Sequence, residues 1–222
     1  MIDLLRALQH GDSFFPSGGV AFSLGLETLK EDGKVRDGAG VERVIAEQLR
    51  QRWASADRAF IAAAHGAAAL DDVVRLDAML DAMTLAKELR EGARRNGAAL
   101  LRVHAELGTP RAADYRLLVR EERAPGHLPI VQGLCFGGRG LARDEALAVA
   151  GHGFLVGLLA AALRLGLIGH VNTQSALTRL HALLAEVLAT PVPLPEDAHA
   201  FTPMPEIAVM RHEVAAGRLF AN

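Results

Sequence analysis

The sequence predicts an all-α fold, a single-domain bundle of about eight to ten helices with a proline-linked C-terminal tail. Of the 222 residues, 50% are hydrophobic but only 5% are aromatic. A core built mainly from Ala, Leu and Val favours closely packed helices over a β-sandwich. Apolar residues recur at helical spacing, and no stretch shows a convincing strand-type alternation.

Charge and cysteine content limit the partners and the compartment. The formal net charge of -2 gives no sign of a nucleic-acid or anionic-membrane partner. The single cysteine, Cys135, excludes an internal disulfide and a Cys-rich zinc site, and it fits a reducing compartment. The N-terminus carries Asp3 and lacks the long apolar run of a secretory signal. We therefore expect a cytoplasmic protein that binds neither nucleic acid nor membrane.

The first predicted elements are a short amphipathic turn and a helix. The turn ends at Gly11, a residue suited to a left-handed C-cap position. The loop DSFFPSGGVAFSLGLE follows, and from 20 to about 33 the pattern is helical. Spacings of four and three place Ser23, Glu27 and Lys30 on one face of this helix.

Four further helices are expected in the next part of the chain. The pattern predicts one from 41 to about 52, a buried Ala-rich one from 54 to about 70, and one from 71 to about 107. The fourth begins near Pro110, because proline is favoured at the first helical position. Residues 120–133 then form a junction whose prolines and glycines interrupt any long helix.

The most apolar segment, 144–169, is long enough to span a membrane. However, it contains His152 and Arg164 and lacks aromatic belts, so a buried central helix is the favoured interpretation. Glycines in it would let a neighbouring helix approach closely: Gly151, Gly153 and Gly157. Another helix is expected from about 173 to 189.

The composition changes sharply after residue 189. We expect a helical body over 1–189, a Pro-rich extended connector over 190–205, and a C-terminal tail over 206–222. The tail is rich in Met, Arg and Phe, which are enriched at interfaces, so partner docking is one interpretation. Packing of a last helix on its own domain is the other, and the sequence leaves both open.

Two motifs of catalysis and nucleotide binding are incomplete. The stretch around Ser23 is one residue short of the G-x-S-x-G elbow of serine hydrolases, since Ala21 replaces the first glycine. No strand is expected before it, so a helical serine hydrolase using Ser23 is only the alternative hypothesis. No Gly-Lys-Ser/Thr triplet occurs, which argues against a phosphate-binding loop.

The chain has nine histidines, but none of them forms the metal-binding spacings H-x-H or H-x-x-x-H. We therefore expect no dedicated metal cage and no bound cofactor. His127 differs from the others because it lies between Gly126 and the extended-favouring Leu128-Pro129 step. Its imidazole is expected either to bond a carbonyl at a helix junction or to serve in a site.

Three motifs, in order along the chain, resemble those of the UreF family of urease accessory proteins. The opening loop resembles the family signature P-x-G-G-x-x-x-S-x-G-L-E through Pro16, Gly18, Gly19, Ser23, Gly25, Leu26 and Glu27. The segment 126-GHLPIVQG-133 resembles G-H-x-P-x-V-x-G, with His127 in the second place. The ending is similar to the H-E/R-L-F pattern through Arg211, His212, Glu213, Arg218, Leu219 and Phe220.

The charged segment 87-KELREGARRNG-97 matches the family's central helix more loosely, at Lys87 and Glu88. Two positions depart from the family pattern. Phe22 precedes Ser23 where the family often has histidine, and Gly169-His170 replaces a common Gly-Gln step. The resemblance therefore carries no water- or metal-conducting role to Phe22 or His170.

The resemblance implies a non-enzymatic, all-helical assembly factor. Proteins of this family usually dimerise and bridge the accessory protein UreD (also called UreH) to the GTPase UreG. That complex loads nickel into apo-urease, so nickel and GTP are handled by partner proteins. The C-terminal tail is associated with docking to the UreD-type partner. The motif residues expected to bind partners are therefore Pro16, Gly18, Gly19, Ser23, Gly25, Glu27, Lys87, Glu88, His127, Arg211, His212, Glu213, Arg218, Leu219 and Phe220.

Overall fold

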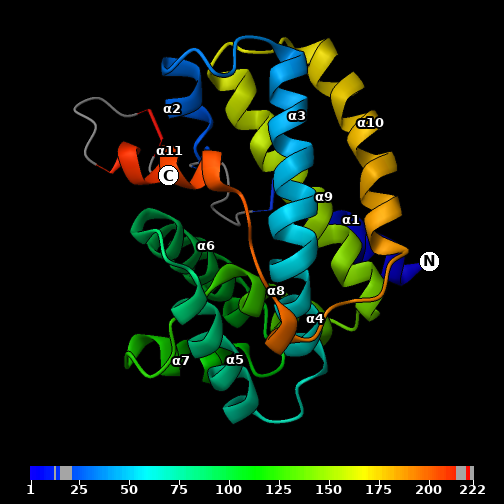
Figure 1. Cartoon of the computed structure of the whole chain (residues 1–222). Helices are drawn as coiled ribbons and strands as arrows, with labels where there is room; N and C mark the ends of the chain where they lie inside the picture. Colours follow the sequence, from blue (N-terminus) through cyan, green and yellow to red (C-terminus); the bar gives the residue numbers. More distant parts are fainter. Residues whose placement is uncertain (13, 16–21, 214–218, 221–222) are drawn as a thin grey trace.

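The computed structural model describes residues 1–12, 14–15, 22–213 and 219–220, and all regular secondary structure within them is helical (Figure 1). This confirms the predicted all-α class. The elements are α1 (Ile2–Gly11), α2 (Leu26–Glu31), α3 (Gly38–Gln48), the π-helix η2 (Leu49–Asp57), α4 (Arg58–Gly66), α5 (Leu70–Met83), α6 (Lys87–Glu106), α7 (Ala112–Arg120), α8 (Leu128–Gly138), α9 (Arg143–Arg164), α10 (His170–Leu188), the 3-10 helix η3 (Pro195–Asp197) and α11 (Pro203–His212).

One long helix forms the spine of the molecule. Helices α3, η2 and α4 run on without a break from Gly38 to Gly66, where the sequence predicted two helices. The Asp37 side chain caps its start by accepting a hydrogen bond from the Gly40 N–H at 2.7 Å. The π segment widens the middle of this helix and carries the buried Trp53.

Helix α9 packs against α1, α3, α4, α8 and α10. A side chain at Gly151 would lie 2.6 Å from Leu184 Cδ1 and 3.0 Å from Trp53, so glycine is needed for this close packing. Gly153 faces open space, and the prediction of a close approach there is wrong. By length and composition α9 could cross a membrane, but 50% of its most apolar window is buried in the bundle, as in a core helix.

The buried side chains form two main clusters. One joins α2, α3, η2, α9 and α10, and the other joins α4, α5, α6, α7 and α8. Helix α11 lies between α2 and α6 (Figure 1). A small third cluster of Ala86, Leu89 and Val209 packs α11 on the start of α6. The last helix therefore connects the two halves.

Three helix boundaries differ from the sequence prediction. The expected helix over 71–107 divides into α5 and α6 at Thr84, whose backbone is extended and whose hydroxyl bonds the Leu80 carbonyl at 2.8 Å. Helix α7 begins at Ala112 rather than near Pro110. Helix α2 begins only at Leu26, so Ser23 precedes the helix and does not share its face.

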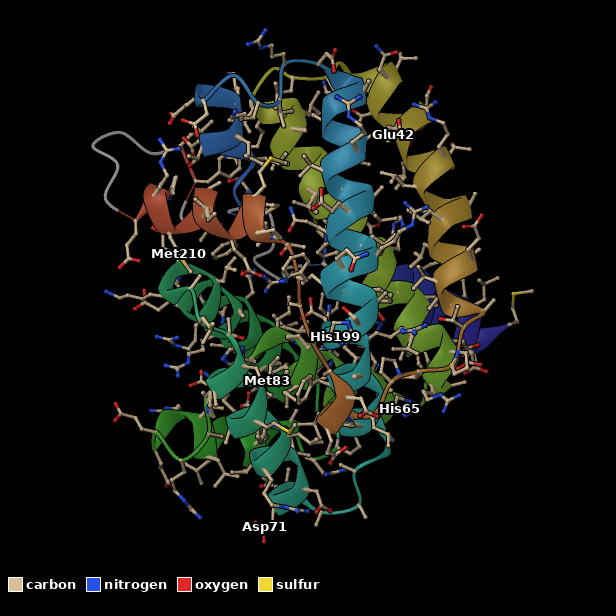
Figure 2. All side chains as sticks on the ribbon, in the orientation of Figure 1. Glu42, His65, Asp71, Met83, His199 and Met210 are labelled. Atoms are coloured by element: carbon tan, nitrogen blue, oxygen red, sulfur yellow. The ribbon has the colours of Figure 1, made fainter. Side chains whose placement is uncertain are left out.

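The Pro-rich connector is fastened to the long helix. The Arg58 guanidinium donates to the carbonyls of Val187 at 2.5 Å and Pro191 at 2.9 Å. The backbone N–H of Phe201 donates to the Gln51 carbonyl at 2.9 Å, and His199 lies beside the same helix (Figure 2). From 190 to 202 the connector is irregular apart from η3, as expected of its prolines. Residues 203–205 already form the first turn of α11, so the expectation of an extended connector is wrong there, because proline is tolerated in the first turn of a helix. The division of the chain at 189 and 205 stays a prediction.

Candidate functional site

Three segments that are far apart in the sequence meet around Glu27. Its Oε2 lies 3.2 Å from His212 Nε2, and the other ring nitrogen of His212 lies 2.9 Å from Glu88 Oε2. Glu27 also accepts the backbone N–H groups of Leu219 at 2.7 Å and Phe220 at 3.1 Å. We call Glu27, Glu88 and His212 the carboxylate–histidine cluster. It joins α2, the first turn of α6 and the C-terminal tail.

The cluster is shielded from water. The side chains of His212, Glu27 and Glu88 are 1%, 8% and 8% exposed. Each ring nitrogen of His212 faces a carboxylate oxygen, so both hydrogen bonds form when both nitrogens carry hydrogen. Buried charge-assisted hydrogen bonds of this kind are strong, so the loss of one partner weakens the cluster.

Ser23 and Gly25 shape the turn that presents Glu27. Gly25 has φ 89°, in the left-handed region, and a Cβ there would lie 2.8 Å from the Pro205 carbonyl oxygen. Glycine is needed for both reasons, because α11 packs directly on this turn. Ser23 is fully buried, and its hydroxyl accepts the Glu27 N–H at 3.4 Å. A serine held in this way is poorly placed to attack a substrate, which disfavours the hydrolase alternative.

Exposed contacts surround the cluster. Arg211 pairs with Asp32, and Lys87 Nζ lies 3.7 Å from Glu213 Oε1. Solvent-exposed pairs of this kind contribute little to stability, because water and salt screen the charges. The Arg164 guanidinium lies 4.4 Å from the centre of the Phe220 ring, in cation–π geometry. These contacts position the tail more than they stabilise it.

His127 belongs to a different buried network, in the α5–α8 half. Its Nε2 lies 2.7 Å from Asp81 Oδ1, so the imidazole bonds a carboxylate and the expected carbonyl bond is wrong. Asp77 accepts the backbone N–H groups of Gly126 at 2.5 Å and of His127 at 3.1 Å, together with the Tyr115 hydroxyl. This network fixes the path of the junction that begins α8.

Burial affects the two carboxyl groups of this network differently. It raises the pKa of Asp77, although the hydrogen bonds from Tyr115 and the junction work in the opposite direction. Burial would also raise the pKa of Asp81, but hydrogen bonds from Arg94 and His127 hold it below its usual value. Asp81 therefore keeps its negative charge to a lower pH than an ordinary aspartate.

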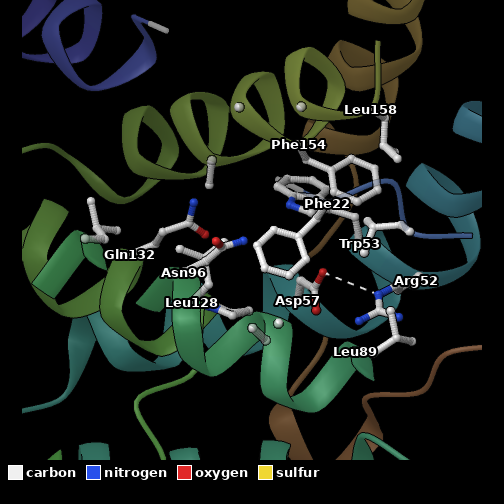
Figure 3. A pocket seen from close by; sticks show the side chains of 18 of the residues that line it. Phe22, Arg52, Trp53, Asp57, Leu89, Asn96, Leu128, Gln132, Phe154 and Leu158 are labelled. Carbon is white, nitrogen blue, oxygen red and sulfur yellow. Dashed lines mark ion pairs between the residues drawn. The ribbon is translucent and has the colours of Figure 1, made fainter. Parts of the chain in front are cut away.

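A cavity of about 180 Å³ lies beside the carboxylate–histidine cluster (Figure 3). Its lining is mostly apolar and includes Phe22, Trp53 and Phe154, and Glu88 contributes to its wall. Arg52 and Asp57 form the ion pair drawn in Figure 3, with Nε and Oδ2 3.9 Å apart. Within the described ranges no three His, Cys, Asp or Glu side chains lie close enough together to hold a metal ion.

The structure brings most of the sequence-predicted residues together. Those around the cluster are Ser23, Gly25, Glu27, Lys87, Glu88, Arg211, His212, Glu213, Leu219 and Phe220. Four motif residues lie outside the described residues: Pro16, Gly18, Gly19 and Arg218. Asp77 and Asp81 belong to none of the sites predicted from the sequence, although their i,i+4 spacing places them on one face of a helix. The partner-binding role of the motif residues stays a prediction.

The chain is similar to proteins of one known family. The family model described as UreF matches residues 35–181. A urease accessory protein UreF from Trichodesmium erythraeum (strain IMS101) is 32% identical over 98% of this chain and 96% of its own length. Proteins of the same name from Cereibacter sphaeroides (strain KD131 / KCTC 12085) and Actinobacillus pleuropneumoniae serotype 5b (strain L20) are 33% and 31% identical, each over 98% of this chain and over 97% and 99% of their own lengths.

Proposed function

The chain belongs to the UreF family of urease accessory proteins, and from this premise we propose that it is a non-enzymatic scaffold for urease maturation. It bridges a UreD/UreH-type protein and a UreG-type GTPase, so that nickel is inserted into apo-urease. Nickel and GTP are handled by those partners. The protein acts in the cytoplasm as a homodimer.

The observation that carries this proposal is the way the tail is held. The inner face of α11 is buried, with His212 locked in the carboxylate–histidine cluster and Val209 packed on α6. The outer face exposes Ile207 and Met210, which are 57% and 45% exposed, and the nearby Leu219 is 55% exposed. Self-packing and partner docking are therefore compatible, since one face of the tail serves each.

Apolar side chains held rigidly at the surface are suited to a protein interface. Met and aromatic residues are enriched in interface cores, and a pre-ordered segment loses less conformational entropy on binding. Met210, labelled in Figure 2, lies on α11 with Arg211 beside it. The outer face of α11 is thus the docking surface that this proposal assigns to the UreD-type partner.

The test is co-purification with the UreD-type and UreG-type partners, followed by nickel-dependent urease activation. We expect the double variant Ile207→Asp/Met210→Asp to bind the UreD-type protein at least about tenfold more weakly, because anchors at an interface centre each contribute more than 1 kcal/mol. Val171→Asp is the matched control, since Val171 is 79% exposed on α10, away from the tail.

Substitutions at exposed positions can weaken docking without weakening the fold, whereas substitutions at buried positions affect both. Phe220 is only 4% exposed, so Phe220→Ala would also weaken the isolated chain. Both surface variants should keep the wild-type melting temperature. Unchanged binding by Ile207→Asp/Met210→Asp would remove the docking role of α11, and full urease activation without this chain would remove the scaffold role.

A further inference from the structure

Two imidazole rings face each other on elements that contribute nothing to the carboxylate–histidine cluster. His152 on α9 and His181 on α10 place Nδ1 and Nε2 3.0 Å apart. Their ring centres are 5.2 Å apart and the ring planes are inclined by 39°. His152 is half-buried and His181 is exposed, so solvent reaches the pair. Both residues lie on long helices, which hold them in fixed positions.

A backbone contact from α1 orients the His152 ring. The ring hydrogen-bonds the backbone of Gly11. Gly11 is the last residue of α1, so its carbonyl has no partner within that helix and is the acceptor. Because Nδ1 faces His181, this donor is Nε2.

That hydrogen bond selects the tautomer. With hydrogen on Nε2, His152 directs an unprotonated Nδ1 toward His181. Histidines that bind metals usually donate their other ring N–H to a carbonyl or carboxylate, which fixes the ring orientation. The end of α1 lies directly against the ring, since a Cβ at Gly11 would be in ordinary van der Waals contact with His152 Cδ2, at 3.5 Å.

The separation of the two nitrogens fits one shared ion. A Zn²⁺–imidazole bond is about 2.0–2.1 Å, so two such ligands at angles between about 90° and 109° stand roughly 3.0–3.4 Å apart. The observed 3.0 Å needs no movement of either helix. His181 has only to place its hydrogen on Nδ1, which its exposed ring allows.

We propose that His152 and His181 bind one divalent transition-metal ion of the kind that prefers imidazole, with water in the remaining positions. Zn²⁺, Cu²⁺ and Ni²⁺ belong to this class, whereas Mg²⁺ and Ca²⁺ prefer oxygen ligands. The site lies beyond the proposed scaffold role and does not depend on it.

The other close histidine pair is unsuited to an ion. His10 and His104 stack with ring centres 5.2 Å apart, between Phe15 and Phe136. A cation there would lose its hydration in apolar surroundings, and the positive charge of Arg139 near both rings would repel it. Among the histidines that the structure describes, the pair on α9 and α10 is the one that combines this geometry with access to water.

The test uses the untagged full-length chain. Equilibrium dialysis with Zn²⁺ should show one ion per chain, with the affinity falling at least about tenfold in His152→Gln and in His181→Gln. With Cu²⁺, electron paramagnetic resonance should show hyperfine splitting from two imidazole nitrogens in the wild type and from one in each variant. His170→Gln is the control, because His170 is exposed at the start of the same helix.

Thermal melts followed by circular dichroism establish that each variant is folded. An affinity and stoichiometry for Zn²⁺ that stay unchanged in His152→Gln/His181→Gln would overturn the proposal. So would a Cu²⁺ spectrum that still shows two nitrogens in His181→Gln. Binding that weakens equally in His170→Gln would assign the ion to nonspecific surface histidines and also overturn it.

Discussion

The molecule contains two buried histidines that each bond a carboxylate, and they connect very different parts of the chain. His127 meets Asp81 across 46 residues, whereas His212 meets Glu88 across 124 residues and Glu27 across 185. The first network lies within the α5–α8 half. The second joins the tail to that half and to α2.

The two networks differ in what depends on them. Asp77 in the first accepts backbone N–H groups of a junction between helices, so the path of the chain relies on it. The second fastens one face of a terminal segment whose other face is exposed. Loss of the first should unfold the bundle, while loss of the second should open the tail locally, because terminal elements can open below the global unfolding free energy.

The largest effect is expected for Asp77→Ala. The substitution leaves the Gly126 and His127 N–H groups and the Tyr115 hydroxyl buried without acceptors. Each such group costs about 1–3 kcal/mol, so we expect a loss of roughly 3–5 kcal/mol in the free energy of unfolding. Urea denaturation measures it.

Asp77→Asn is the matched control, since its amide oxygen still accepts hydrogen bonds and the loss should be smaller. A loss below about 1 kcal/mol for Asp77→Ala would show that the junction does not depend on this carboxylate. The contrast between the two networks would then fail.

Acid should weaken the helical body through His104, a fully buried ring on α6. Burial lowers the pKa of His104 to about 4, and the charges of His10 and Arg139 act in the same direction. The unfolded chain, with an ordinary pKa of 6.5, takes up the proton more readily. Stability contributed by this ring is therefore complete above pH 6.5 and is lost as the pH falls to about 4.

Over that window the loss should approach about 3 kcal/mol. Urea unfolding at pH 7 and at pH 4.5 measures it, and His104→Gln should remove most of this difference. An equally steep pH dependence in His104→Gln would assign the acid sensitivity to other groups. His104 bonds Thr109 and is not part of the carboxylate–histidine cluster, so this acid effect tests the helical body and not the tail.

The helices were predictable because a helix that buries one face repeats apolar residues every three to four positions, and the sequence shows this spacing. Their exact ends were less so. Helical spacing placed Ser23 on a helix, but Leu24 and Gly25 have φ values of 47° and 89°, which delay α2 to Leu26. A periodic pattern of apolar residues does not report such backbone angles. For the same reason the π segment η2 was predicted as a break between two helices.

The candidate site was predictable as a set of residues but not as an arrangement. Family motifs named Glu27, Glu88 and His212, yet spacing along the chain cannot show that these three side chains meet. Asp77 and Asp81 lie outside every motif, and only their partners in the folded chain explain them. Contacts between remote segments are set by the tertiary packing, which a single sequence does not display.

The smallest effect on global stability is expected for Glu27→Gln, although the tail should respond strongly. The glutamine amide keeps one acceptor oxygen. Its NH₂ group, however, faces another donor, which is the N–H of Leu219, the N–H of Phe220 or the His212 ring. We expect a local loss of about 1–3 kcal/mol in the free energy of opening. Hydrogen exchange should accelerate across α11, while the amides of α5 and α8 keep wild-type protection.

Asp32→Asn is the control, because the contact that the described residues show between Asp32 and the tail is the exposed pair with Arg211, which water screens. It should leave exchange in α11 nearly unchanged. Faster exchange throughout the bundle in Glu27→Gln would mean that the carboxylate–histidine cluster supports the whole fold, as the Asp77 network does. Faster exchange confined to α11 would identify the cluster as the fastening of the tail, with the outer face of that helix free to bind.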